Sequence, residues 1–139
     1  MIIRYCRESI CMGDDADRGF YMLDVPESTT VQELVEIMHS GGYGNTWPIP
    51  VYEDCCWVVL SNIGAIATLI RDHEQKLHIE YAGFDKDDSV KHLGILAVYA
   101  CRPIKYDWKE IDENNYQSLV QRLLDSAEKN AGDYSYWVR

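Results

Sequence analysis

The sequence predicts an α+β fold: a mainly antiparallel mixed sheet of five to seven strands, packed by two amphipathic helices at about residues 30–40 and 114–130. The length of 139 residues, with 47% hydrophobic and 12% aromatic residues, is typical of one compact domain. Most apolar residues fall in short runs bounded by polar turns, as strands do. Two segments instead repeat apolar residues every three or four positions, as helices do. We therefore expect a single domain, residues 1–139.

The first 25 residues predict a β-hairpin. Residues 1–12 alternate and are rich in β-forming side chains, and residues 19–25 form a second strand-like run. The segment between them, residues 13–17, has the composition of a turn. The two strands are therefore joined by a wide acidic loop.

A capped helix is predicted directly after Pro26. Thr30 and Glu33 match a capping box, in which a hydroxyl and a carboxylate satisfy backbone amides at the helix start. Gly41 and Gly42 supply a left-handed stop. The apolar positions that share one helical face are Val31, Leu34, Val35 and Met38.

The middle of the chain predicts further strands, after a loop over residues 43–50 that has to shelter Trp47. Four apolar runs have strand length and β-forming composition: residues 57–60, 65–70, 77–81 and 93–101. Short polar turns between them predict an antiparallel meander. The uninterrupted apolar run in residues 94–99 indicates a central strand that is covered on both faces.

The C-terminal quarter predicts the second helix. Its start is capped by Asp112, or by Asn114 with Gln117, and it stops at residues 130–132. Residues 133–139 alternate like an edge strand or an extended arm. The apolar stripe of this helix consists of Tyr116, Leu119, Val120, Leu123, Leu124 and Ala127.

The first 40 residues or so resemble the opening of a ubiquitin-like β-grasp domain. The resemblance lies in the order strand, turn, strand, then the segment Pro26-Glu-Ser-Thr-Thr30 and the helical run 31–38. Such domains also begin with an apolar strand and enter their helix through a Ser/Thr-rich cap. An elaborated β-grasp fold is implied, because residues 53–101 hold more strand than a minimal one. Conjugation chemistry is not implied, because residues 136–139 are not an exposed Gly-Gly end.

The chain is acidic, with 23 Asp and Glu against 13 Lys and Arg and a formal net charge of −10. A field of one sign favours partners of the opposite sign. The Lys and Arg residues are scattered singly and form no stripe that could neutralise phosphates, so nucleic acid is not an expected partner. No apolar stretch approaches the roughly 20 residues that span a bilayer, and no secretory signal begins the chain. We expect a cytoplasmic protein with no membrane partner.

No cofactor or metal site is predicted from the cysteines and histidines. The cysteines are odd in number and lack a C-x-x-C pair, so buried reduced thiols are expected. No histidines lie at a ligand-like spacing, and the acidic neighbours of Cys55 and Cys56 disfavour a nucleophilic thiol. The five cysteines are Cys6, Cys11, Cys55, Cys56 and Cys101, and the four histidines are His39, His73, His78 and His92.

Carboxylates gather in several predicted loops, and each cluster taken alone is explained by solvated turn residues. Asp85–Asp88 also lacks the spacing of a calcium loop. Together the loops offer a negative surface to a basic partner, with tryptophans as anchors, provided that they meet at one end of the sheet. The candidate partner-binding residues are Asp14, Asp15, Asp17, Glu53, Asp54, Asp85, Asp87, Asp88, Trp108 and Trp137, and a further acidic group spans 107–113.

The sequence therefore predicts a small, acidic, non-catalytic binding protein that engages a basic protein. Its most concrete form is an immunity or inhibitor protein that blocks a toxin by presenting carboxylates where phosphates would lie. One alternative is an accessory or regulatory subunit of a larger assembly. A second is an enzyme whose site lies around Cys55, His73 or His92, and this would require a histidine joined to a thiol or carboxylate within a pocket.

Overall fold

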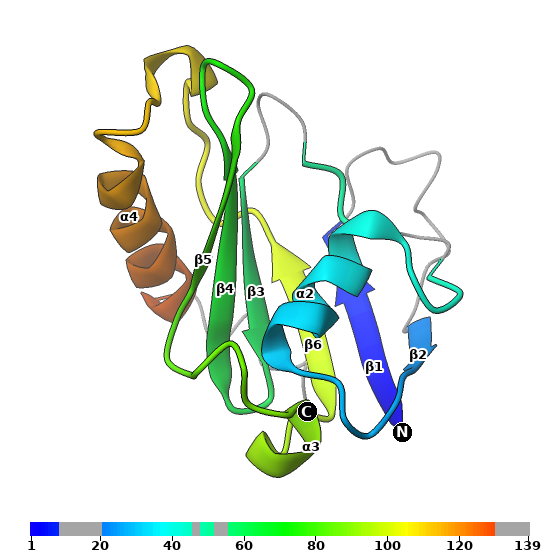
Figure 1. Cartoon of the computed structure of the whole chain (residues 1–139). Helices are drawn as coiled ribbons and strands as arrows, with labels where there is room; N and C mark the ends of the chain where they lie inside the picture. Colours follow the sequence, from blue (N-terminus) through cyan, green and yellow to red (C-terminus); the bar gives the residue numbers. More distant parts are fainter. Residues whose placement is uncertain (9–20, 46–47, 52–55, 130–139) are drawn as a thin grey trace.

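The computed structural model describes residues 1–8, 21–45, 48–51 and 56–129, and it has the predicted α+β architecture (Figure 1). None of the helices in these ranges is long and apolar enough to cross a membrane. The elements are β1 (Ile2–Arg7), β2 (Tyr21–Asp24), α2 (Val31–Ser40), β3 (Trp57–Ser61), β4 (Gly64–Arg71), β5 (Leu77–Tyr81), α3 (Val90–Leu93), β6 (Ala97–Cys101), the 3₁₀ turn η1 (Trp108–Glu110) and α4 (Tyr116–Lys129).

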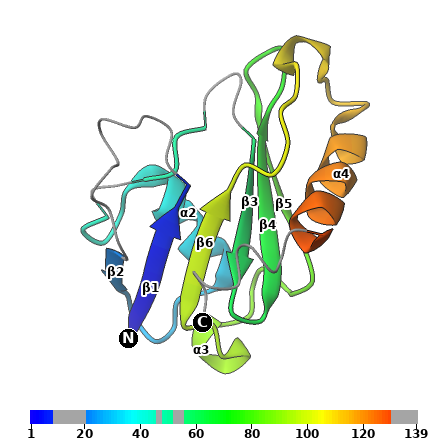
Figure 2. The same cartoon turned by 180° about the vertical axis from the view of Figure 1, so that it is seen from behind.

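The strands form one six-stranded mixed sheet in the order β2-β1-β6-β3-β4-β5 (Figure 2). β1 and β2 pair as the predicted antiparallel hairpin, and β3, β4 and β5 form an antiparallel meander. The prediction that the fourth run continues this meander is wrong. β6 instead returns to the middle of the sheet, where it lies parallel to β1 and antiparallel to β3.

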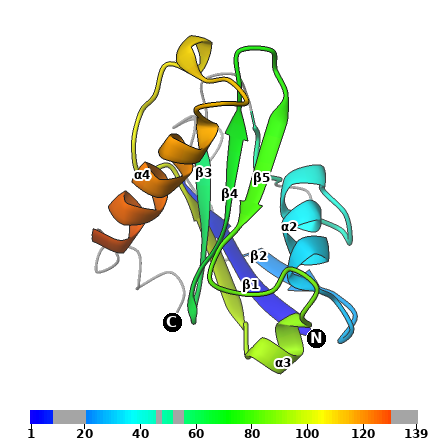
Figure 3. The same ribbon diagram turned by 60° about the vertical axis from the view of Figure 1, so that its left-hand side comes forward.

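The sheet lies between two helical layers, because α2 packs on one face and α4 on the other (Figure 3). Side chains alternate between the two cores along each strand. On β3, for example, Trp57 and Val59 contact the α2 side, and Val58 contacts the α4 side. β4 and β3 are the strands that α4 contacts most. Within residues 1–8 and 56–129, Cys6, Cys56 and Cys101 are buried thiols on the α4 side, as predicted.

β6 is the central strand that the apolar run predicts, and all five of its residues are buried. The predicted start of this strand at Leu93 is wrong, because residues 90–93 form the short helix α3. The Ser89 side chain accepts a hydrogen bond from the backbone N–H of His92, and Gly94 ends the helix with a left-handed φ of 77°. Local capping thus outweighs the β-forming composition of the segment.

α2 matches its prediction from Val31 to Ser40. The Thr30 hydroxyl accepts a hydrogen bond from the Glu33 amide at 3.1 Å, and Gly41 closes the helix with a φ of 85°. α4 starts at Tyr116 rather than at 114, because the Asp112 carboxylate accepts hydrogen bonds from the amides of Asn114 and Asn115. Of the two predicted caps, Asp112 therefore holds this turn. The predictions for Trp47 and for residues 133–139 lie outside the described residues.

Thr30→Ala should lower the free energy of unfolding by about 1 kcal/mol, because it removes the acceptor of the capping box. Urea denaturation followed by far-UV circular dichroism measures the change. Thr30→Ser keeps a hydroxyl at the same position and should remain close to wild type. Equal losses in the two variants would show that the methyl group of Thr30, and not the cap, is what matters.

Candidate functional site

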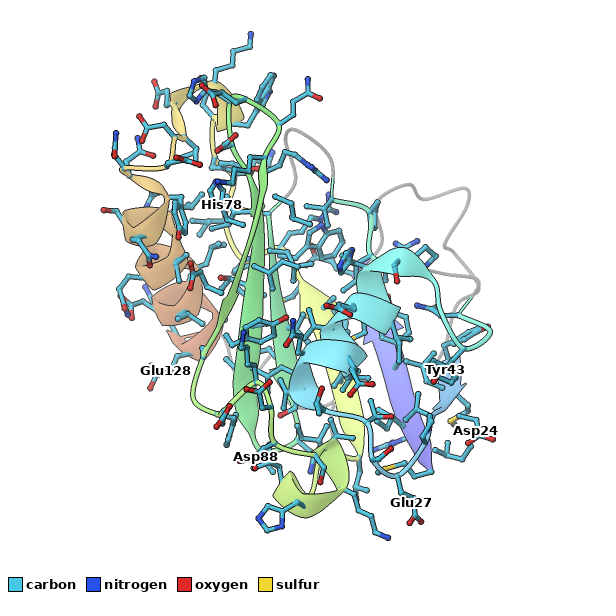
Figure 4. All side chains as sticks on the ribbon, in the orientation of Figure 1. Asp24, Glu27, Tyr43, His78, Asp88 and Glu128 are labelled. Atoms are coloured by element: carbon cyan, nitrogen blue, oxygen red, sulfur yellow. The ribbon has the colours of Figure 1, made fainter. Side chains whose placement is uncertain are left out.

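A group of carboxylates surrounds the start of α2, and we call it the α2 acidic surface. Six of its seven residues are exposed and Asp88 is half-buried. Figure 4 shows its labelled members, Asp24, Glu27 and Asp88, at the same end of the molecule. The cations near this group are Lys86, Lys91 and the N-terminal amino group, which lies 3.5 Å from Asp24. The α2 acidic surface consists of Asp24, Glu27, Glu33, Glu36, Asp85, Asp87 and Asp88.

Backbone hydrogen bonds hold the 85–89 loop against the first turn of α2. The Val31 and Gln32 amides donate to the carbonyls of Asp88 and Lys86 at 3.0 and 2.9 Å. The side chains of Lys91 and Glu27 form an ion pair at 2.8 Å across the same junction. The first backbone amides of a helix have no acceptors within the helix. The carbonyls of this loop supply two of the acceptors that α2 lacks. Its aspartates are consequently placed beside the glutamates of the helix.

The predicted site residues that the structure describes lie at two ends of the sheet. Asp85, Asp87 and Asp88 belong to the α2 acidic surface, whereas Trp108 is half-buried in η1, at the opposite end (Figure 1). The acidic group at 107–113 lies near Trp108 and is therefore separated from Asp85–Asp88. The remaining candidates, Asp14, Asp15, Asp17, Glu53, Asp54 and Trp137, lie outside the described residues.

Much of the acidic group at 107–113 is used within the fold. The Asp107 carboxylate caps η1 by accepting the Lys109 amide at 3.1 Å, and Asp112 caps the turn before α4. Glu113 forms an ion pair with Lys76 of the β4–β5 turn. These carboxylates have intramolecular partners, as the solvated-turn interpretation predicts. The group has four carboxylates, against seven in the α2 acidic surface.

A buried carboxylate–imidazole pair joins the turn after β4 to β5, and the sequence did not single it out. Asp72 Oδ2 lies 2.8 Å from His78 Nε2, with the two side chains 1% and 7% exposed. Asp72 Oδ1 accepts the amides of Glu74 and Lys76 at 2.9 and 3.0 Å. Burial opposes ionisation, but the hydrogen bonds from His78, Lys76 and Glu74 outweigh it and hold the pKa of Asp72 below its ordinary value.

α4 covers this pair through Tyr116, whose ring stacks on His78 at a centroid distance of 4.0 Å. The Tyr116 hydroxyl donates to Glu80 Oε1 at 2.7 Å, and Gln117 donates to the same oxygen at 3.2 Å. The hydrogen bond to Glu80 raises the pKa of Tyr116, because it favours the protonated phenol. The cluster therefore attaches the first turn of α4 to the β4–β5 hairpin.

An aspartate that orients a histidine is also found in acid–base catalysis, where the imidazole serves a nucleophile. Among the described residues, no hydroxyl or thiol donates a hydrogen bond to His78, and no group of three or more His, Cys, Asp or Glu side chains could hold a metal ion. His73 and His92, in contrast, lie at opposite ends of the sheet, on the β4–β5 turn and in α3. Burial raises the pKa of the Cys6 and Cys101 thiols, which lowers their reactivity.

One sequence signal could have found this cluster. The alternation Leu77-His78-Ile79-Glu80-Tyr81 places His78 and Glu80 on the same face of β5. Asp72 becomes the partner of His78 only because the tight β4–β5 turn brings residues six apart in the chain together. Tyr116 comes from a helix more than 30 residues away, and no local pattern relates it to β5.

Comparisons with known proteins identify no relative: no protein-family model matches the chain, and no curated protein or solved structure is significantly similar to it.

Asp72→Asn should lower the free energy of unfolding by about 2–4 kcal/mol, because it weakens a buried charge-assisted network. Chemical denaturation at neutral pH measures the loss. The pKa of Asp72 in the folded state is below its ordinary value of 3.8, so the carboxylate stabilises the fold fully above that value. Its contribution is lost as the pH falls through the folded-state pKa. The difference between wild type and variant should therefore shrink below about pH 4.

Asp107→Asn is the matched control, because Asp107 also accepts a backbone amide but is exposed and has no imidazole partner. It should cost much less than Asp72→Asn, since water can replace the lost hydrogen bond. Equal losses for the two variants, or a difference from wild type that grows towards acid pH, would contradict the role assigned to Asp72.

Proposed function

We propose that this chain is a small non-catalytic binding protein that engages a basic protein partner through the α2 acidic surface. The most concrete form is an immunity or inhibitor protein that neutralises a toxin. The observation that carries the proposal is the concentration of seven carboxylates, six of them exposed, around the start of one helix. Such a surface steers a basic partner towards itself and suppresses acidic competitors.

The way in which these carboxylates are held supports this function. Glu33 and Glu36 stand on the exposed side of α2, whose apolar side is buried in the core. Asp85, Asp87 and Asp88 stand on a loop whose carbonyls are bonded to the same helix. A partner that binds a preorganised surface loses less conformational freedom on association. The geometry therefore suits tight binding, beyond the solubility that net charge gives.

An inhibitor of this kind would present carboxylates where the phosphates of a nucleic acid lie in a toxin's basic cleft. The proposal includes a cytoplasmic location, and it involves no cofactor, nucleic acid or membrane. We also propose that the fold is an elaborated β-grasp. Two features support it: the helix that follows the first hairpin, and the later strand β6 that returns to lie parallel to β1. β5 and α4 would be the additions.

The partner should be a basic protein encoded beside this chain, and its affinity should weaken as salt rises. Isothermal titration calorimetry of each purified neighbouring gene product, at about 50 and 300 mM salt, tests this, because exposed charges are screened over this range. The triple variant Glu27→Gln, Glu36→Gln, Asp87→Asn should weaken binding at least about tenfold, as expected for the loss of several interfacial charges.

A control variant with the same change in charge is Glu110→Gln, Asp125→Asn, Glu128→Gln, whose three positions are exposed and lie outside the α2 acidic surface. It should bind nearly as wild type does. Equal weakening of binding by both triple variants would show that the net charge of the protein, and not the α2 acidic surface, causes the effect. A neighbouring product that binds with no dependence on salt would overturn the electrostatic proposal.

One observation favours the alternative of an accessory subunit. Ile2, Met22 and Leu96 are 53%, 55% and 59% exposed. Ile2 and Met22 lie on one face of the sheet, because Met22 pairs with Arg4, two residues from Ile2. Leu96 precedes β6 on the other side of β1, where its carbonyl accepts the Arg4 amide at 3.0 Å. Exposed apolar side chains of this size commonly mark contact surfaces.

If the accessory-subunit alternative holds, Ile2→Ser with Met22→Ser should abolish binding of the neighbouring product, and high salt should strengthen wild-type binding, because salt favours apolar contacts. The same calorimetric titration measures both effects. Binding that survives the double variant would dismiss the alternative.

A further inference from the structure

β5 ends the sheet, and its outer backbone groups have no partner among the described residues. β4 is the strand with which β5 pairs. The backbone hydrogen bonds Asp72 N–Lys76 O and Ala82 N–Ile66 O, at 3.0 and 2.9 Å, mark the hydrogen-bonded positions of this pair. Hydrogen-bonded and non-hydrogen-bonded positions alternate along an antiparallel pair. The N–H and C=O groups of Leu77, Ile79 and Tyr81 therefore point away from β4. No hydrogen bond within the described part of the chain uses these outward groups.

The strand is held rigidly in this position. The side chains of Leu77, Ile79 and Tyr81 are half-buried against the α2 core. On the other face, His78 is bonded to Asp72 and Glu80 to Tyr116. Figure 3 shows β5 at the edge of the sheet, with α2 and α4 on either side of it. An incoming strand would therefore meet an extended backbone that is already ordered.

β5 also lacks the usual protection of an edge strand. Natural edges commonly carry lysine, proline or a bulge that prevents pairing with another chain. Residues 77–81 contain neither lysine nor proline, and their register with β4 is regular. Lys76, just before the strand, is engaged by Glu113. An unprotected edge is a template for strand addition.

The charges beside this edge are mainly negative. Glu80 lies on β5 itself, and the Glu36 carboxylate of α2 is close enough to Tyr81 to contribute to the raised pKa of its phenol, of which burial is the larger cause. Glu74 and Asp85 flank the two ends of the strand. Two cations lie next to β5. Lys76 is paired with Glu113, and Arg71 of β4, opposite Leu77, donates to the carbonyls of Val51 and Gln75. An extended segment with lysine or arginine side chains would therefore be attracted from both faces.

We propose that β5 binds an extended, basic segment of the protein partner as an additional antiparallel or parallel strand. The backbone groups of Leu77, Ile79 and Tyr81 supply the hydrogen bonds, and Glu36 and Glu80 select for basic side chains. This inference rests on the proposed function and gives it a binding mode. It adds directed backbone hydrogen bonds to a charge attraction that alone has little geometric specificity.

The test uses the full chain and two synthetic peptides: acetyl-(Lys-Val)₄-amide, and the same peptide with every backbone amide N-methylated. Both carry four ammonium groups, but the backbone of the methylated peptide cannot donate hydrogen bonds. Two-dimensional amide NMR should show saturable shifts at Leu77, Ile79 and Tyr81 with the first peptide. Hydrogen exchange of these three backbone amides with solvent should slow about tenfold when the peptide is at ten times its Kd. The methylated peptide should produce neither effect.

Two variants test the edge directly. Ile79→Pro removes one outward N–H without removing a hydrogen bond to β4, and it should weaken binding of the first peptide about fivefold, the worth of one hydrogen bond. Ile79→Val keeps that N–H and should bind within about twofold of wild type, because the methylene it loses packs against the α2 core and not against the added strand. Should the proline variant fail to fold, the comparison of the two peptides on the wild-type chain still decides the question.

The outcomes separate this inference from the proposed function. If both peptides bind equally and shift the amides of Asp85–Asp88, the acidic surface binds basic segments and strand addition at β5 is overturned. Shifts confined to β2, the other edge of the sheet, would overturn it as well. If neither peptide binds, strand addition is also overturned, whereas the proposed function is then judged by the neighbouring gene product alone.

Discussion

The whole fold depends on the burial of β6 on both of its faces. Val98 and Ala100 contact the α2 core, and Tyr99 and Cys101 contact the α4 core. A strand with two apolar faces is stable only as the middle layer of a three-layer structure. The chain therefore provides α2 before the central strands and α4 after them. The parallel pairing of β6 with β1 follows from the same need, since it places β6 in the interior of the sheet.

Enclosing the sheet between helices creates a second requirement, which is to satisfy the polar groups at the helix ends. At the start of α2, the Thr30 cap is joined by carbonyls of the 85–89 loop. At the start of α4, Asp112 caps the preceding turn and Tyr116 bonds to Glu80. These contacts have opposite consequences for function. The contacts at the start of α2 bring aspartates and glutamates together on an exposed surface. The contacts at the start of α4 engage carboxylates in hydrogen bonds within the molecule.

The placement of α4 also determines what remains available for a partner. It packs mainly on β4 and β3 and covers the Asp72–His78 pair, so that this pair stabilises a helix and is withdrawn from solvent. Within the described part of the chain, no element covers the outer side of β5 or the apolar residues Ile2 and Met22. The binding functions that we propose therefore lie at the margins of the sheet and at the α2 acidic surface. The buried polar cluster is part of the framework that holds them.

The sequence by itself determined the elements with strong local signals. The capping box at Thr30 and the glycine stop at Gly41 defined α2, and the apolar stripe of residues 116–127 defined α4, because these signals act within a few residues. Only the tertiary structure decided that β6 lies beside β1, that Asp85–Asp88 adjoin Glu33 and Glu36, and that Asp72 meets His78 under Tyr116. Each of these contacts joins residues through turns or the sheet, and the free energy that selects it comes from burial and pairing, which no local window contains.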